Sequence, residues 1–174
     1  MAIVLYFLWR NGEPRTEIGW VARKPLVEVL IGAALFPAMF FGTGWLDRLL
    51  TKVGLTSPST SLPSFVPAGN FGQAALAVAL VAVVALSEET VFRGYLMLRF
   101  RALTGSPAAA VLLSAVVFSL GHGYEGSSGV VTVGAVGAVF AIVYLWRRSL
   151  TAPMVMHFLQ DFLSIVLLPL LTGR

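Results

Sequence analysis

Long apolar runs separated by short polar segments make up most of this chain. Apolar stretches occupy residues 26–46, 107–121, 130–146 and 152–170, and a fifth, 71–100, carries charged residues in its second half. A helix needs about 20 mainly apolar residues to cross the hydrocarbon core of a bilayer. The pattern therefore predicts membrane-spanning helices over these stretches.

The remaining segments complete the expected organisation. Residues 1–9 are apolar but too short to span, which indicates either the end of a helix that begins upstream or an interfacial segment. Residues 10–25 form a polar connector, 47–70 an irregular loop rich in Ser, Thr, Pro and Gly, and 123–129 a turn or re-entrant piece. We expect an all-α fold, a polytopic transmembrane bundle of about five to six spans, as a single domain over 1–174.

Composition supports this class of protein. Of 174 residues, 57% are hydrophobic and 11% are charged, whereas a soluble domain carries about 25% charged residues. The absence of cysteine excludes disulfides and thiolate metal ligands. The net charge of +4 comes from Lys and Arg in the short segments between apolar runs, a distribution that indicates membrane topology and no nucleic-acid partner.

The basic residues also predict an orientation. With residues 10–25 in the cytoplasm and the spans alternating from there, the cytoplasmic side carries more Lys and Arg than the outer side, as the positive-inside rule requires. The cytoplasmic set is Arg10, Arg15, Arg23, Lys24, Arg99, Arg101, Arg147 and Arg148, and the outer set is Arg48, Lys52 and Arg174.

Two adjacent carboxylates and an arginine interrupt the 71–100 run, in the sequence Ser87-Glu88-Glu89-Thr90-Val91-Phe92-Arg93. Ionisable groups in hydrocarbon are costly, are usually paired and mark functional sites. Glu89 and Arg93 are i,i+4 neighbours on a helix, so Arg93 can neutralise Glu89. Glu88 lies about 100° further round the helix. It is therefore the carboxylate left to face something else.

Other polar side chains lie in two later spans, and they include both histidines of the chain: His122, His157, Gln160 and Asp161. A buried polar cluster of this kind can simply lock helices together. It can also hydrolyse a substrate, because a Glu and a His can deprotonate a shared water while a second His donates to an oxyanion. Alternatively, His122, His157 and Glu88 could hold a zinc ion with an open water position.

Three polar motifs with i,i+4 spacing follow one another on successive predicted helices: Glu88-Glu89-x-x-x-Arg93, Phe118-x-x-x-His122 and His157-x-x-x-Asp161. Together they resemble the CPBP family of CAAX-processing and bacteriocin-processing intramembrane proteases, also called the Abi family, which is related to the Rce1 prenyl-protein endopeptidase. The resemblance covers residues 71–170. It implies a multi-pass peptidase of a prokaryotic cytoplasmic membrane, with a site open to water inside the bilayer and a peptide or protein substrate.

The resemblance also implies roles for individual residues. Glu88 would be the general base on the attacking water, and His122 would share that water. Glu89 and Arg93 would support and orient the site. His157 would donate to the oxyanion, and Phe118 would pack beside the first histidine.

Asp161 departs from the asparagine that is common in relatives of this family. An ionised aspartate cannot donate to an oxyanion, so Asp161 would be protonated, orient His157 or bind a metal. The family has been described both as metalloproteases and as metal-free glutamate proteases. We expect no cofactor, with zinc as the alternative.

Two other functions fit the same polar residues. One is a non-catalytic membrane scaffold of the same fold that binds a partner protein. The other is a small proton-coupled transporter, since intramembrane Glu and His also serve proton relays. The absence of an internal repeat in the sequence disfavours the transporter.

Helix depth tests whether the motifs can meet. Glu88 lies 13 residues before Arg101, and His122 lies 15 residues after Pro107, which are similar depths of about 20 and 22 Å. His157 lies only 4 residues after Pro153, or about 6 Å. Its helix must therefore tilt, begin deeper or enter through a recessed loop.

Residues outside the motifs have simpler interpretations. Gly134 and Gly137 predict close helix packing. Glu28 lies near the start of the 26–46 span, where a charged side chain can reach the interface. Gly123-Tyr124-Glu125-Gly126 predicts a turn in preference to a gate. The tryptophans predict anchoring at the membrane interfaces: Trp9, Trp20, Trp45 and Trp146.

Overall fold

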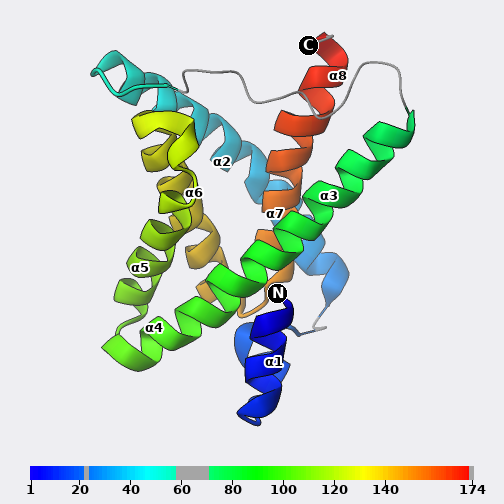
Figure 1. Ribbon diagram of the computed structural model, residues 1–174, viewed down its shortest axis with the longest axis vertical. Coiled ribbons are helices and arrows are strands. Elements are labelled where there is room, and N and C mark those ends of the chain that lie inside the picture. Colours follow the sequence, from blue (N-terminus) through cyan, green and yellow to red (C-terminus); the bar gives the residue numbers. More distant parts are fainter. Residues whose placement is uncertain (22–23, 58–70, 173–174) are drawn as a thin grey trace.

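The computed structural model describes residues 1–21, 24–57 and 71–172, and all regular secondary structure in these ranges is helical. They form six continuous helices, three of which contain more than one segment. Figure 1 shows their arrangement. The segments are α1 (Ala2–Arg10), η1 (Arg15–Ile18), α2 (Pro25–Lys52), α3 (Phe71–Glu89), η2 (Thr90–Leu96), α4 (Met97–Thr104), α5 (Pro107–Leu120), η3 (Gly123–Glu125), α6 (Gly126–Arg147), α7 (Thr151–Asp161), η4 (Phe162–Leu167) and α8 (Leu168–Thr172).

Four of these helices are long and apolar enough to cross a membrane: Pro25–Lys52, Phe71–Thr104, Gly123–Arg147 and Thr151–Leu171. The fifth expected span, α5, is a shorter apolar helix of 14 residues. It begins as the sequence predicts, because the Ser106 hydroxyl caps it by accepting a hydrogen bond from Ala109 N. The structure therefore confirms an all-helical fold and indicates a multi-pass membrane protein, with four helices of spanning length in the described ranges where the sequence predicted about five to six.

Two expected loops are partly helical. Helix α2 continues through Asp47 to Lys52, so only the remainder of the expected 47–70 loop lies beyond it, and residues 58–70 are outside the described residues. The expected 123–129 turn is a 3-10 turn followed by the first residues of α6. The reason is a long-range cap: Thr56 Oγ1 accepts from Ser127 N at 3.2 Å, and Thr56 O accepts from Ser128 N at 3.1 Å.

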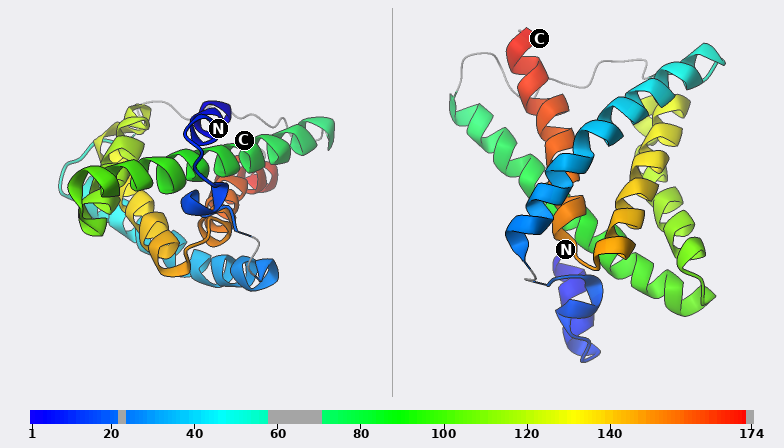
Figure 2. Two further views of the ribbon diagram at one scale, coloured as in Figure 1. Left: turned by 90° about the horizontal axis from the view of Figure 1, so that it is seen from below. Right: turned by 180° about the vertical axis from the view of Figure 1, so that it is seen from behind.

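The helix ends gather at two opposite ends of the bundle (Figures 1 and 2). The connector after α1, the end of α4 and the α6–α7 link lie at one end, whereas the end of α2, the start of α3 and the α5–α6 turn lie at the other. This arrangement agrees with the alternation used to count basic residues. Glu28 corrects one expectation: it is 4% exposed and pairs with Arg147 at 2.7 Å, because a cation from α6 reaches it inside the protein.

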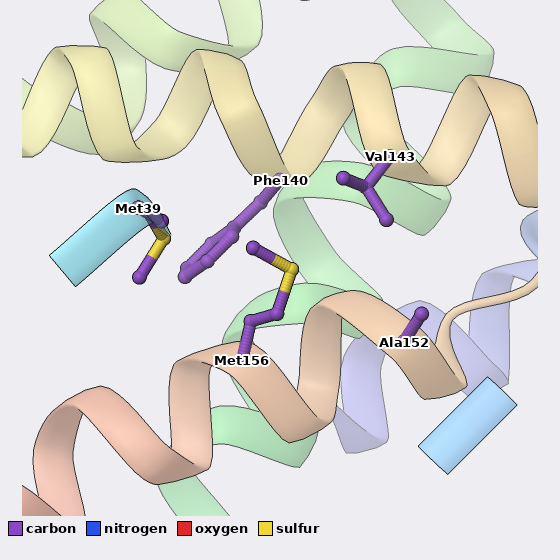
Figure 3. Packing of buried hydrophobic residues seen from close by; sticks show 5 residues of the cluster. All are labelled: Met39, Phe140, Val143, Ala152 and Met156. Atoms are coloured by element: carbon purple, nitrogen blue, oxygen red, sulfur yellow. The ribbon is translucent and has the colours of Figure 1, made fainter. Parts of the chain in front are cut away.

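The core that supports α7 joins it to α2 and α6. Figure 3 shows Phe140 of α6 and Met156 of α7 close together, with Met39 of α2 beside them. Phe140 is fully buried and Met156 is 1% exposed. This packing fixes the face of α7 that carries the second histidine, because interior side chains are close-packed and move little.

The start of α7 explains how His157 reaches the depth of the other motifs. Ser149 and Leu150, which precede the helix, are 2% and 1% exposed. The backbone N–H of Leu150 donates to Gly19 O at 3.0 Å. The α6–α7 link therefore lies inside the protein beneath the N-terminal connector. Of the three possibilities that the sequence left open, burial of this link favours the recessed loop.

Candidate active site

The first motif lies where the long α3–α4 helix changes its hydrogen-bond spacing. Glu89 is the last residue of α3, and a π-helical segment begins at Thr90 and ends at Leu96. Single π-helical turns are rare and occur frequently at functional sites. Arg93 Nη1 donates to Glu89 Oε1 at 2.8 Å, and both side chains have no exposed surface. The predicted neutralisation of Glu89 by Arg93 is confirmed.

The same oxygen of Glu89 contacts the second histidine. His157 Nδ1 lies 2.8 Å from Glu89 Oε1. Because an ionised carboxylate can only accept, Nδ1 carries the hydrogen and donates it. The other ring nitrogen, Nε2, lies 3.4 Å from Asp161 Oδ2 and 3.8 Å from Glu88 Oε2. Glu89 therefore fixes the ring so that Nε2 faces the other two carboxylates.

His122 follows α5 and is oriented by the last turn of that helix. Its Nδ1 lies 2.9 Å from Phe118 O. A carbonyl oxygen only accepts, so Nδ1 is the donor, and the neutral ring then has an acceptor at Nε2. The ring of Phe118 lies 4.8 Å from the imidazole, centroid to centroid, which confirms the expected packing. A histidine in this tautomer can take a hydrogen bond from water.

One cavity of about 370 Å³ connects the three motifs. Glu88 of α3, His122 after α5, and His157 and Asp161 of α7 all line it. The two other predicted site residues, Glu89 and Arg93, lie behind this wall and are fully buried. The structure thus brings all six predicted site residues together, four at the cavity and two supporting it.

Besides its ion pair with Glu89, the guanidinium of Arg93 contacts aromatic rings. Its Cζ lies 4.2 Å from the ring centroid of Phe118 and 5.2 Å from that of Phe140, both cation–π distances. Phe140 also stacks on His157, with centroids 5.4 Å apart and planes at 28°. Phe140 could not be identified from the sequence, because an apolar residue inside an apolar span indicates only a core position.

Gly137 makes this arrangement possible. A Cβ at this position would meet Phe118 Cδ1 at 3.0 Å and Arg93 Nη2 at 3.1 Å. The expected close packing at Gly137 is therefore confirmed, and its neighbours are site residues. Gly134 packs more loosely, since a Cβ there would lie 3.4 Å from Ser119 Cβ.

The cavity wall is acidic. Besides Glu88 and Asp161, it includes Glu125 from the turn before α6, and the described lining residues contain neither Lys nor Arg. The sequence interpretation of Glu125 as part of a simple turn was therefore incomplete. The pattern of apolar and polar residues could not have identified Glu125, because a 3-10 turn of three residues has no periodic pattern. The position of this turn also depends on the contact of the following residues with Thr56.

The donor set does not fit a zinc ion as arranged. No group of three or more His, Asp or Glu side chains among the described residues is placed to hold a metal ion. One nitrogen of each histidine is engaged, by Glu89 for His157 and by the Phe118 carbonyl for His122, which leaves Nε2 as the one nitrogen of each ring that could bind a metal. Zinc requires three converging protein ligands at about 2.0–2.2 Å in a catalytic site.

A comparison with known families matches the same part of the chain. A family model described as type II CAAX prenyl endopeptidase Rce1-like covers residues 70–163, which is more than half of the chain and contains all three motifs. Searches of curated proteins and of solved structures found no match. The chain therefore belongs to the Rce1-like family of type II CAAX prenyl endopeptidases, a membership that implies a protease.

Proposed function

We propose that this protein is an intramembrane endopeptidase that hydrolyses a peptide bond in or beside a prokaryotic cytoplasmic membrane, with Glu88 as the general base. The observation that carries the proposal is the meeting of Glu88, His122 and His157 at one cavity within an apolar bundle. A polar lock between helices would need no cavity. Family membership supports the same reaction class.

In the first step, Glu88 removes a proton from a water that His122 also binds. His122 suits this role because its Nε2 is the acceptor nitrogen. The water oxygen bonds to the carbonyl carbon of the substrate, and the carbonyl electron pair moves to its oxygen. Positioned acid–base groups of this kind contribute about 10²–10⁴-fold to a rate.

In the second step, His157 stabilises the oxyanion. Its Nδ1–H is committed to Glu89 at 2.8 Å, so a protonated ring directs its Nε2–H into the cavity. When the tetrahedral intermediate collapses, the C–N bond breaks, and Glu88 returns its proton to the leaving nitrogen. We assign Asp161 the role of orienting His157, because its carboxylate lies 3.4 Å from Nε2.

The proposed reaction uses no metal. It is supported by the absence of a three-ligand set among the described residues. Activity of the purified protein should therefore survive exhaustive treatment with chelators. Loss of activity on chelation, with recovery on adding one equivalent of zinc, would contradict this part of the proposal.

The test of the reaction compares three proteins reconstituted in nanodiscs with a library of membrane-anchored peptides. Fragments are identified by mass spectrometry for the wild type, Glu88→Gln and the control Glu17→Gln, an exposed carboxylate away from the cavity. We expect wild type and control to cleave, and Glu88→Gln to lose at least about 10²-fold. A wild type as inactive as Glu88→Gln would support a non-catalytic scaffold instead.

A further inference from the structure

The N-terminal connector contacts the rear of the site, although it precedes the family-matched region 70–163. Ile18 is fully buried, and a Cβ on Gly94 would meet its carbonyl oxygen at 3.0 Å. Arg99 donates two hydrogen bonds to the Glu13 carboxylate, from Nη1 to Oε1 at 2.8 Å and from Nη2 to Oε2, and these hydrogen bonds lower the pKa of Glu13 below its usual value. The connector therefore contacts the long α3–α4 helix at Gly94, inside the π-helical segment, and at Arg99, just after this segment ends.

Trp20 differs from the other three tryptophans of the chain. It is 37% exposed, whereas Trp9, Trp45 and Trp146 are 77%, 66% and 62% exposed. Its indole Nε1–H donates to Thr90 Oγ1 at 3.1 Å. Anchoring at the membrane interface would require no such partner inside the bundle, so the sequence interpretation does not account for this residue.

Thr90 is the residue after Glu89 and the first of the π-helical segment. It has no exposed surface, and its hydroxyl donates to Leu86 O at 2.6 Å while accepting from Trp20. The hydroxyl of Thr90 therefore acts as a donor and as an acceptor at the same time. A threonine bonded to the carbonyl four residues earlier bends a helix slightly, here within one turn of both glutamates.

The direction of Glu88 and Glu89 depends on where the hydrogen-bond spacing changes. A π-helical turn holds more residues than an α-helical turn, so a shift of its start rotates one part of the helix against the other. Two side chains bind the segment from outside: Trp20 at Thr90 Oγ1, and Ser114, whose hydroxyl donates to Phe92 O at 2.9 Å.

We propose that Trp20 is a positioning residue for the protease proposed above. Its indole N–H holds Thr90 at the start of the π-helical segment, and through it sets the direction in which Glu88 faces the cavity and Glu89 holds His157. The inference rests on the proposed function. It extends the working site to a connector that lies outside the matched family region.

The experiment measures kcat and KM for Trp20→Phe, which keeps the ring and removes the donor, with Trp45→Phe as the matched control. We expect kcat to fall about tenfold, because displacements near 1 Å can cost about 10²-fold in rate, while KM stays within about twofold. The control should keep wild-type kcat and KM. The midpoint of thermal unfolding, measured in parallel, separates a positioning effect from general loss of folded protein.

Two substitutions at Thr90 approach the same contact from its other partner. Thr90→Ser keeps the hydroxyl and should retain most of the wild-type kcat, whereas Thr90→Val should lower kcat at least as far as Trp20→Phe. The double variant Trp20→Phe/Thr90→Val should fall no further than Thr90→Val alone, because both changes remove one interaction.

Multiplicative losses in the double variant, equal losses in Trp20→Phe and the Trp45 control, or an effect on KM alone would overturn the inference. If Glu88-dependent cleavage is observed and Trp20→Phe keeps wild-type kcat, the inference fails while the proposed function stands. If the wild type shows no Glu88-dependent cleavage, both fail.

Discussion

Replacing Gly137 by alanine tests how tightly the arginine of the site is enclosed. The added Cβ would lie 3.0 Å from Phe118 Cδ1 and 3.1 Å from Arg93 Nη2. Carbon atoms in favourable contact are about 3.5–4.0 Å apart, so these neighbours would have to move by about half an ångström. The ring of Phe118 has little room, because the rings of Phe92 and His122 lie 5.0 and 4.8 Å from it, centroid to centroid.

Two opposing terms set the magnitude. Alanine in a helix interior is favoured over glycine by about 0.5–1 kcal/mol, whereas overpacking of a close-packed interior is unfavourable by about 1–3 kcal/mol. We therefore expect Gly137→Ala to lower the free energy of unfolding by about 1 kcal/mol. Glu89 Oε1 contacts both Arg93 and His157. A displaced Arg93 would therefore shift Glu89 and with it His157, so kcat should fall as well.

Gly44→Ala is the matched control, since Gly44 also lies within a helix and a Cβ there would have no neighbour within 4 Å. It should be neutral or stabilising by up to about 1 kcal/mol. Unfolding of both variants in detergent, followed by far-UV circular dichroism, should give free energies that differ by about 1–2 kcal/mol. A Gly137→Ala variant at least as stable as Gly44→Ala would refute the enclosure argument.

Three further predictions use other parts of the structure. Arg93→Met leaves Glu89 buried without its cation, so the free energy of unfolding in detergent should fall by about 3–5 kcal/mol; a loss below about 1 kcal/mol would show that water or another cation reaches the carboxylate. Glu28→Gln removes the charge that pairs with Arg147 at 2.7 Å, so the thermal unfolding midpoint should fall while kcat at room temperature is kept, and a selective loss of kcat would contradict this structural role. Because the cavity wall carries acidic groups and no described Lys or Arg, peptides with Asp or Glu beside the cleaved bond should show lower kcat/KM than Asn or Gln counterparts. Glu125→Gln should narrow that difference, and equal rates for both peptide sets in the wild type would refute the electrostatic reasoning.

The sequence predicted those features that depend on local spacing. The pairing of Glu89 with Arg93 follows from i,i+4 geometry, and it survives the change to π-helical spacing. The apolar runs predicted the helices, because a segment in lipid must satisfy its backbone hydrogen bonds internally. The motifs indicated that Glu88, His122 and His157 would meet, since isolated polar groups in hydrocarbon are costly.

Features that depend on contacts between distant segments were not predictable. The helical start of α6 relies on Thr56, which lies about 70 residues earlier in the chain and caps Ser127. Burial of Glu28 relies on Arg147. The depth of His157 relies on a link that binds Gly19. No local pattern of apolar and polar residues encodes any of these partners.

Three buried polar residues of the site form a hydrogen-bonded series, and Glu88 lies outside that series, at the cavity. Arg93 binds Glu89, and Glu89 binds His157, so these three buried groups connect η2 and α3 to α7. In surroundings without water such bonds are strong, and an unpaired member would be costly. This series can therefore hold the imidazole rigidly, whereas Glu88 faces the cavity and forms no ion pair with an arginine among the described residues. In the proposed mechanism the adjacent glutamates therefore have different roles: Glu89 is neutralised and fixes the geometry of His157, and Glu88 is the base that takes a proton from water.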